Sequence, residues 1–130
     1  MTRIWGRLSI IKEFEFHSAH HLPNHEGKCK NVHGHCWKLF VEVATKDGSF
    51  LPTDGPEAGM IMDYGRLKEI VNREIINCLD HKDLNGMFEN PTSETIIIWI
   101  ATTLMQVLPG LASVKLYETD TSYAVWRTVK

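Results

Sequence analysis

The sequence predicts an α+β fold in which a four-stranded antiparallel sheet carries two helices on one face. Two long segments, 8–20 and 33–45, alternate between apolar and polar residues, which is typical of strands with one buried face. Two segments with a helical apolar repeat follow, and two short alternating segments come last. The order is therefore strand, strand, helix, helix, strand, strand. Short connections between consecutive strands favour antiparallel pairing, with both helices packed on the same sheet face.

Size and composition are those of a single soluble globular domain covering residues 1–130. The hydrophobic content is 43% and the charged content 23%, both ordinary values. A net charge of -2 argues against a nucleic-acid partner, which would need a basic face to neutralise phosphates, but leaves room for a local basic pocket for a small phosphorylated ligand. The longest apolar run, 96–101, is too short to cross a bilayer, so no membrane is expected either. The odd number of cysteines, 3, indicates a reducing compartment, and we expect a cytoplasmic protein.

Each of the two long strands carries histidine on its buried face. In the first strand, His20 shares the parity of Phe16 and of the other apolar residues. In the second, His33 and His35 share the parity of the apolar residues that follow them. The segment between the strands, 22–32, contains proline, asparagine and glycine and is predicted to be a loop.

An irregular loop is predicted over 46–60, where glycine, proline and aspartate are frequent. Asp63 is predicted to cap the first helix at its N-terminus. The apolar stripe of that helix comprises Tyr64, Leu67, Ile70, Val71, Ile75, Cys78 and Leu79.

The second helix is predicted to begin at Asn90 or Thr92 and to run to about Leu108, where a Pro-Gly pair stops it. Residues 96–100 are apolar on nearly all sides of this helix, so we expect it to be buried on more than one side. The last two strands are predicted at about 111–119 and 123–129, with a turn at residues 120–122.

Three histidines predict a metal site. Residues two apart on a strand project from the same face, so His33 and His35 point the same way. If the two long strands are antiparallel neighbours, His20 lies beside the start of the second strand. Neutral imidazole suits zinc, and three protein ligands with one open position are typical of a catalytic zinc site. An apolar face tolerates such polar groups only when they are satisfied, which favours ligands over ordinary strand-end residues.

Other histidines and cysteines are poorer candidates for this ion. Two histidines have the parity opposite to His20, and a third lies in the middle of a loop; these are His17, His21 and His25. Cys36 is expected to point away for the same reason of parity. Cys29 is the one thiol that can approach the ion, and if it were a ligand the site would be closed and structural.

Acid–base chemistry has three further candidates. Two lysines flank Cys29, and cationic neighbours favour a thiolate, although an inert loop cysteine fits the spacing equally well. Asp80 directly precedes His81, an arrangement that often fixes the tautomer of an imidazole, but a solvated loop is an alternative. Glu118 shares a strand face with apolar residues and is either a rim residue or a ligand anchor.

Taken in this order, the motifs resemble those of the 6-pyruvoyltetrahydropterin synthase and 6-carboxytetrahydropterin synthase family. The similarity runs from about Phe14 to Trp126. It is carried by Ser18-Ala19-His20, CKNVHGH at 29–35, GMIMDY at 59–64, LDHKDLN at 79–85, NPTSE at 90–94 and YET at 117–119. The resemblance implies the tunnelling fold, in which three subunits join their sheets into a barrel and two trimers stack into a homohexamer. Active sites in such an assembly lie between subunits.

The resemblance also implies a role for each candidate residue. It implies zinc as the cofactor, with ligands His20, His33 and His35. It implies a catalytic set comprising Cys29, Asp80, His81 and Glu118. It implies a pterin pocket lined by Thr92, Ser93 and Glu118. In this scheme Cys29 accepts the proton, His81 relays it with Asp80 as its partner, and Glu118 grips the amino-pyrimidine edge of the pterin.

The implied substrate is 7,8-dihydroneopterin triphosphate. A cysteine four residues before His-Gly-His looks most similar to the bacterial 6-carboxytetrahydropterin synthases of queuosine and deazapurine biosynthesis, which release acetaldehyde and triphosphate. A pyruvoyl-forming and a hydroxymethyl-forming activity remain alternatives, and Glu26 keeps the second of these open. Lys28, Lys30 and Arg127 are equal candidates for the triphosphate contact. Outside the family, a zinc hydrolase and a zinc-stabilised binding module are the alternatives.

Overall fold

A computed structural model describes residues 2–129, and its framework is a pair of long strands. β1 (Ser9–His20) and β2 (His33–Ala44) are antiparallel and pair residue by residue over their whole length. The predicted ranges, 8–20 and 33–45, are each one residue longer. The pairing puts His20 directly opposite His33 at one end of the sheet.

The sheet has five strands in the order β3-β1-β2-β4-β5, so the predicted count of four is wrong by one short edge strand. β3 (Lys82–Asp83) pairs in parallel with β1. Two residues are too few to show an alternating pattern, so the sequence could not reveal this strand. β4 (Leu111–Thr119) and β5 (Ser122–Arg127) are antiparallel neighbours at the other edge, as predicted, although β5 is shorter than 123–129.

The first helical segment is continuous in space but consists of three elements: α1 (Tyr64–Val71), the π-helical η2 (Asn72–Ile76) and α2 (Asn77–Leu79). The Asp63 side chain accepts a hydrogen bond from the Arg66 backbone N–H and caps α1, as predicted. Tyr64 does not belong to the buried stripe, because 53% of its surface is exposed. It is the first residue after the cap, where the helix leaves the sheet edge.

α3 (Ser93–Met105) begins after Thr92, whose hydroxyl accepts a hydrogen bond from the Thr95 backbone N–H. This selects Thr92 over Asn90 as the N-cap. The helix ends three residues before Leu108. Its buried residues span a broad side that includes Ile96 and Ile97, while Ile98 is 58% exposed.

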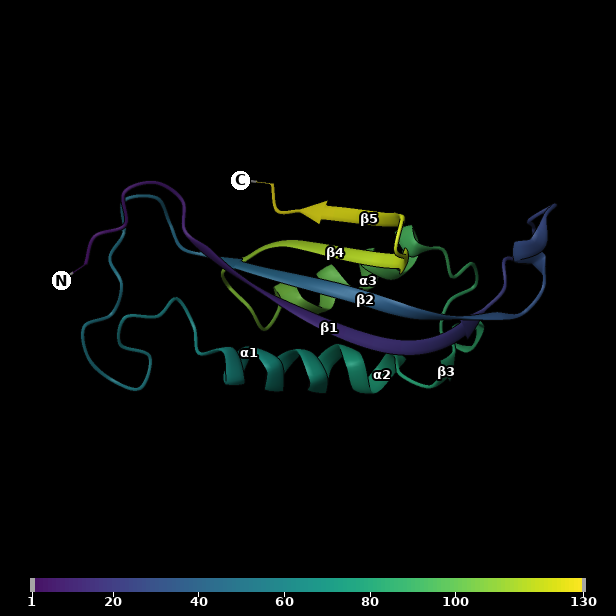
Figure 1. Ribbon diagram of the computed structural model, residues 1–130, viewed down its shortest axis with the longest axis horizontal. Coiled ribbons are helices and arrows are strands. Elements are labelled where there is room, and N and C mark those ends of the chain that lie inside the picture. Colours follow the sequence, from purple (N-terminus) through teal and green to yellow (C-terminus); the bar gives the residue numbers. More distant parts are fainter. Residues whose placement is uncertain (1, 130) are drawn as a thin grey trace.

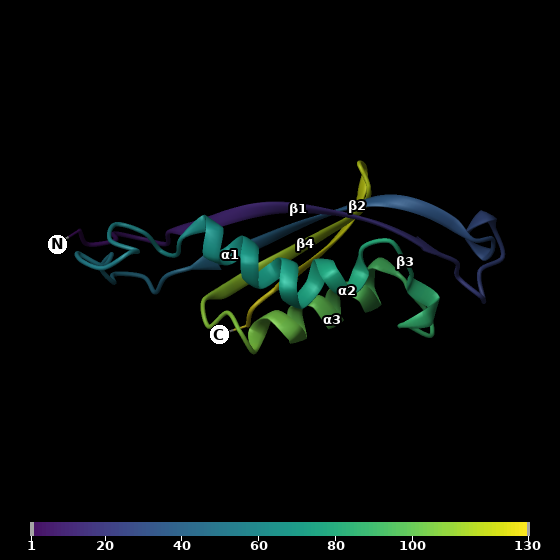
Figure 2. The same cartoon turned by 90° about the horizontal axis from the view of Figure 1, so that it is seen from below.

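All of these helices cover the same face of the sheet, which gives two layers (Figures 1 and 2). The core lies between the layers and is made by the inward side chains of the strands and helices. Fully buried members include Phe16, Trp37, Leu39, Leu67, Ile75, Ile96, Ile100 and Leu116. None of the helices within residues 2–129 is long and apolar enough to cross a membrane. His20 is completely buried at the end of this core, and that position sets the site described next.

Candidate metal centre

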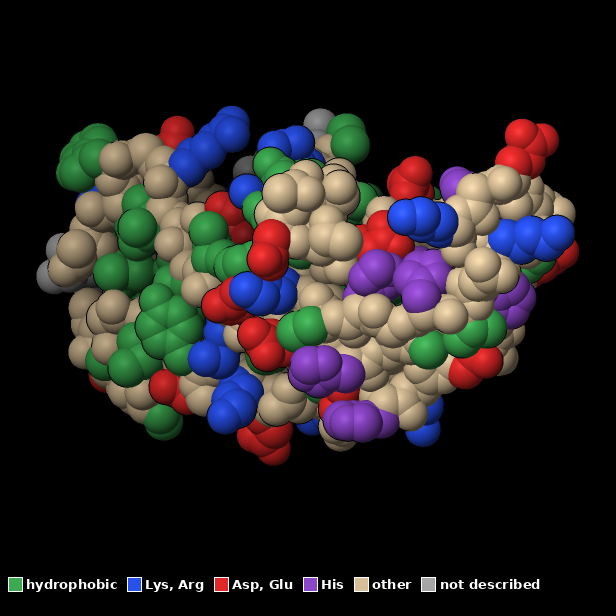
Figure 3. All heavy atoms as spheres, turned by 45° about the vertical axis from the view of Figure 1, so that its right-hand side comes forward, with side chains coloured by type: hydrophobic (Ala, Val, Ile, Leu, Met, Phe, Trp, Pro, Cys, Tyr) green, Lys and Arg blue, Asp and Glu red, His purple; other side chains and the backbone are tan. Residues whose placement is uncertain are grey.

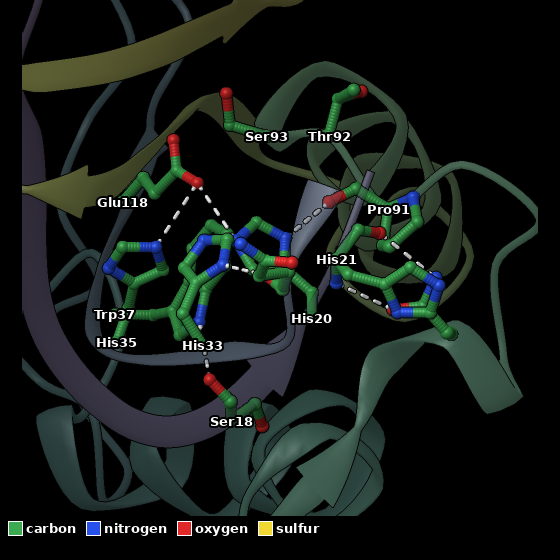
Figure 4. Close-up of polar contacts among 12 residues, drawn as sticks. Ser18, His20, His21, His33, His35, Trp37, Pro91, Thr92, Ser93 and Glu118 are labelled. Atoms are coloured by element: carbon green, nitrogen blue, oxygen red, sulfur yellow. Dashed lines mark hydrogen bonds and ion pairs between the residues drawn. The ribbon is translucent and has the colours of Figure 1, made fainter. Parts of the chain in front are cut away.

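Four potential metal ligands converge at the end of the sheet where β1 and β2 meet. His20, His33, His35 and Glu118 each offer a donor atom, and these atoms all lie within 4.8 Å of one another. Figure 4 shows the imidazoles facing one another and the Glu118 carboxylate reaching toward them from β4. In the space-filling view, histidine side chains gather over this end of the molecule (Figure 3).

Strand geometry explains the convergence. His33 and His35 are two apart on β2 and therefore project from one face, while His20 is the cross-strand partner of His33. Glu118 follows Leu116 on the inward face of β4, next to β2. The floor of the cluster is Trp37, which is fully buried and lies edge-on to His20 and His35 at ring-centroid distances of 5.1 and 5.6 Å.

Backbone carbonyls orient two of the three imidazoles. The Nδ1–H of His20 donates to the carbonyl of Pro91 at 2.8 Å, and the Nδ1–H of His33 donates to that of Asn31 at 2.7 Å. In the neutral ring, each of these bonds leaves Nε2 unprotonated, with a lone pair that can bind a metal ion. Metal-bound histidines are usually held in this way, with the second ring nitrogen bonded to a carbonyl or a carboxylate.

Within residues 2–129, two buried imidazole nitrogens of this cluster have no hydrogen-bond partner: Nε2 of His20 and Nε2 of His35. Their one charged neighbour is shared, because Glu118 Oε1 lies at ion-pair distance from both, at 3.0 and 3.4 Å. A buried polar atom without a partner costs about 1–3 kcal/mol, so two of them side by side call for an occupant. A cation satisfies both nitrogens and the carboxylate at once.

Charge and burial act in opposite directions on this group. Burial lowers the pKa of His35, and it also opposes the charged form of His20. Glu118 and the Pro91 carbonyl outweigh burial at His20 and raise its pKa above the ordinary value. The contact with His20 in turn lowers the pKa of Glu118, although burial opposes this. The cluster therefore holds an ionised carboxylate among imidazoles at neutral pH, and that arrangement attracts a positive ion.

The donor set fits a divalent transition metal. Imidazole nitrogens with one carboxylate oxygen suit zinc and its first-row neighbours, whereas calcium and magnesium prefer oxygen ligands alone. Glu118 offers a carboxylate oxygen to the same group. It is therefore a fourth candidate ligand, which its parity on the strand alone does not distinguish from a rim residue.

The other histidines and cysteines lie outside this group. Cys29 is half-buried in η1 (Lys28–Lys30), a short 3-10 turn in the loop that joins β1 to β2, and its thiol is not among the converging donors. His21 and His25 are also outside it: the backbone of His21 is bonded to Asn85, and the ring of His25 accepts from Gly27.

Asp80 and His81 form an ion pair at the edge of β1 that faces away from β2. Asp80 Oδ2 lies 3.0 Å from His81 Nδ1, and Asp80 Oδ1 accepts the backbone N–H of His17 at 2.8 Å. This second bond, more than the contact with His81, lowers the pKa of Asp80. His81 has a positive φ of 56°, a conformation that is strained for a residue with a side chain, and its side chain is 80% exposed. The pair is therefore pre-formed, but one chain does not bring it into the metal cluster.

Thr92 and Ser93 lie directly after Pro91, the residue whose carbonyl holds His20 (Figure 4). The Thr92 hydroxyl caps α3, and the Ser93 hydroxyl donates to Glu94 at 2.9 Å. The hydrogen bond between the Pro91 carbonyl and His20 thus links the start of α3 to the metal cluster. A ligand held by Thr92 and Ser93 would lie beside the imidazoles.

Two partners of the site escaped the sequence analysis. These are the carbonyls of Pro91 and Asn31, which orient His20 and His33. Backbone acceptors leave no mark in a residue pattern. The only available signal was proximity in the chain, since Asn31 is two residues before His33.

Comparisons with known proteins find similar sequences. A family model described as 6-pyruvoyl tetrahydropterin synthase matches residues 9–128. A Synechocystis protein named 6-carboxy-5,6,7,8-tetrahydropterin synthase is 47% identical over 88% of this chain and 89% of its own length. The human 6-pyruvoyl tetrahydrobiopterin synthase is 35% identical over 78% of this chain and 71% of its own length.

The fold has a close counterpart among solved structures. The structure of Caenorhabditis elegans 6-pyruvoyl tetrahydropterin synthase superposes with a TM-score of 0.79 and covers 99% of this chain and 100% of the other. The two sequences are 23% identical, so this likeness concerns the fold. It identifies the sheet and helices described above as the tunnelling fold that the motifs implied.

Proposed function

The chain belongs to the 6-pyruvoyl tetrahydropterin synthase family, and on that basis we propose that it is a zinc-dependent 6-carboxy-5,6,7,8-tetrahydropterin synthase. Its substrate would be 7,8-dihydroneopterin triphosphate, and its products 6-carboxytetrahydropterin, acetaldehyde and triphosphate. The observation that carries the proposal is the pair of orphaned Nε2 atoms on His20 and His35, beside His33 and Glu118. The name of the Synechocystis relative supports the carboxy product.

The zinc ligands in this proposal are His20, His33 and His35. Their convergence and the carbonyl bonds to two of them support the assignment. A bound zinc ion supplies Lewis-acid polarisation of a substrate hydroxyl, which makes the neighbouring C–H more acidic. The protein's share is a fixed set of ligands on two rigid strands above the buried Trp37.

Proton transfer is assigned to Cys29 and to the pair of Asp80 and His81. The Cys29 thiolate removes a proton from carbon, and His81 returns or relays protons while Asp80 holds its ring. The 3.0 Å contact between Asp80 Oδ2 and His81 Nδ1 supports this division, because it leaves Nε2 of His81 free to face a substrate.

Two copies of the chain are needed to assemble this machinery. Cys29 belongs to the loop between His20 and His33, so it accompanies the metal ligands of its own chain. His81 bonds through its backbone to His17, whose side chain is on the sheet face opposite to His20. We therefore assign His81 to the metal centre of a neighbouring subunit, within the hexamer that the family resemblance implies. The exposed edge strands β3 and β5 are available for such contacts.

The pterin ring is assigned to the start of α3 and to Glu118. Thr92 and Ser93 are one residue away from the Pro91 carbonyl, so a ring bound there would present its side chain to the imidazoles. Glu118 accepts hydrogen bonds from two N–H groups of an amino-pyrimidine edge with both of its oxygens when it is ionised, and the contact with His20 lowers its pKa in that direction. The same carboxylate can turn toward the metal when no pterin is bound.

Incubation of the zinc-loaded protein with 7,8-dihydroneopterin triphosphate tests the proposal. Mass detection of the pterin product, together with an acetaldehyde assay, should show 6-carboxytetrahydropterin and acetaldehyde in equal amounts. A pyruvoyl or hydroxymethyl pterin as the main product would move the protein to a sister activity. No pterin turnover at all would leave the hydrolase and the zinc-stabilised module as the surviving alternatives.

A further inference from the structure

A second cluster of metal-ligating side chains lies on the outer face of the sheet. Glu15, His17 and Cys36 each offer a donor atom, and these three atoms also lie within 4.8 Å of one another. All three residues are exposed on the face that carries no helix. None of their side chains has a part in the proposed pterin chemistry. We propose that they form a second site, which binds a thiophilic divalent transition-metal ion.

Strand pairing holds this cluster as firmly as it holds the first. His17 and Cys36 are direct cross-strand partners on β1 and β2, and Glu15 is two residues before His17 on the same face. Both strands are 12 residues long and pair along their whole length, so the three side chains stand on a rigid platform. A metal ion therefore needs only rotamer changes, and no backbone movement, to collect all three ligands.

Alternation along the strands separates the two sites. His35 and Cys36 are neighbours in the chain but point to opposite faces of β2, as do Ser18 and His17 on β1. The first site lies on the buried side with imidazole and carboxylate donors. The second lies on the solvent side and contains a thiol. One ion cannot use both sets.

The donor chemistry indicates the class of ion. A thiolate with an imidazole and a carboxylate suits zinc, cobalt and similar ions, and disfavours magnesium and calcium. Three protein ligands leave at least one position for water, which makes the site open rather than closed.

Neighbouring charges limit the affinity of the second site. Lys38 is the cross-strand partner of Glu15, and its ammonium group lies 4.0 Å from Asp120 rather than bound to Glu15. This cation opposes a divalent ion on the same face, so the second site should be weaker than the first. His81 is the nearest further imidazole, with its ring centre 6.1 Å from that of His17, but it is outside the donor group.

Cobalt(II) distinguishes the two sites because only a thiolate ligand gives a sulfur-to-cobalt charge-transfer band. Protein carrying one equivalent of zinc should be titrated with cobalt(II) under reducing conditions. The band should grow to saturation at one further equivalent of cobalt(II). Cys36→Ser should abolish it. His17→Ala should weaken cobalt(II) binding by roughly 10- to 100-fold or more. Loss of a hydrogen-bond partner of a metal ligand already costs that much affinity, and His17 is proposed as a ligand itself.

Two cysteine variants serve as controls. Cys78→Ser, on the helix layer, and Cys29→Ser, near the first site, should both keep the band. All three replaced residues lie outside the buried core, and circular dichroism checks that each variant is folded. Absence of the band at saturating cobalt(II), or its loss in Cys29→Ser with retention in Cys36→Ser, would overturn the proposal.

Discussion

The polar clusters at the two ends of the sheet differ in how their groups are hydrogen-bonded. At one end, the Glu42 carboxylate on β2 accepts hydrogen bonds from the hydroxyls of Ser9 at 2.7 Å and Ser113 at 2.6 Å. At the other end, the Nε2 atoms of His20 and His35 have no hydrogen-bond partner among the described residues and share one carboxylate oxygen of Glu118 as an ion-pair partner. The first cluster has its hydrogen bonds within one chain. The second has the donor atoms of a metal site.

This difference separates a structural polar cluster from a binding site. Both clusters use neighbouring strands and both shift the pKa of a carboxyl group downward. For Glu42 the cause is mainly the Ser113 hydroxyl and then the Ser9 hydroxyl, which need nothing further. For Glu118 the cause is mainly His20, which itself remains unsatisfied. The informative feature is therefore the missing partner and not the perturbed pKa.

The largest effect is expected from His33→Ala. Loss of one imidazole should remove the stoichiometric metal and lower pterin turnover by about 1,000-fold or more, since a metal contributes several kcal/mol of transition-state stabilisation. Metal content by mass spectrometry and product formation should fall together. His25→Ala, in the adjoining loop, is the matched control and should change neither. A His33→Ala protein that kept one zinc per chain would contradict the ligand assignment.

Cys29→Ala should separate metal binding from chemistry. The variant should keep its zinc, because the Cys29 thiol is outside the donor group, but lose about 10²- to 10⁴-fold in kcat as a proton acceptor is removed. Cys78→Ala should retain normal turnover. A Cys29→Ala protein with full pterin turnover would contradict the role of Cys29 as the proton acceptor.

Subunit mixing tests where His81 acts. Cys29→Ala and His81→Ala should each be inactive alone, and mixed oligomers should regain turnover because some sites then combine an intact Cys29 with an intact His81. Single-variant oligomers put through the same dissociation and reassembly are the control. Failure to regain activity, with mixed oligomers demonstrated by mass, would place both residues in the same subunit's site.

Asp80→Asn should have a smaller effect than loss of His81 itself. The amide still accepts the His17 backbone N–H but no longer forms the ion pair that holds the His81 ring, so kcat should fall by about 10- to 100-fold with little change in KM. Asp83→Asn is the control, because Asp83 caps the neighbouring turn η3. An unchanged kcat, or a loss that appears in KM alone, would exclude Asp80 as the positioning residue.

The smallest effect is expected at the satisfied end of the sheet. Glu42 has a pKa below its ordinary value of 4.5 in the folded chain, so its stabilisation is present above that pH and disappears as the pH falls through the lowered value. Glu42→Gln should therefore cost about 1 kcal/mol at neutral pH and nothing at strongly acid pH. Urea unfolding at several pH values measures this. Metal content should be unaffected, and a loss of zinc would break the distinction between the two ends.

Much of the fold followed from periodicity. The alternation in β1 and β2 and the inward parity of His20, His33 and His35 were readable because both strands have one buried face. Shorter or less regular features were not readable. β3 is too short to alternate, and the π-helical η2 preserves the apolar repeat of an ordinary helix closely enough to be hidden.

The site was less predictable than the fold wherever it depends on distance between elements. The parity of Glu118 indicated its strand face, but only the pairing of β2 with β4 reveals that its carboxylate lies 3.0 Å from His20 Nε2. Parity also predicted that Cys36 turns away from the first cluster. It did not predict that Cys36 would meet His17 and Glu15, because that meeting needs the register of the strands.

X-ray absorption at the zinc edge tests the metal assignment most directly. The sample should be Cys36→Ser protein with one equivalent of zinc, so that the outer-face cluster contributes no thiolate. Three converging imidazoles predict a first shell of nitrogen and oxygen at about 2.0–2.1 Å, with imidazole multiple scattering. A sulfur neighbour at about 2.3 Å would instead mean that Cys29 closes the site, and the catalytic role proposed for its thiolate would be wrong.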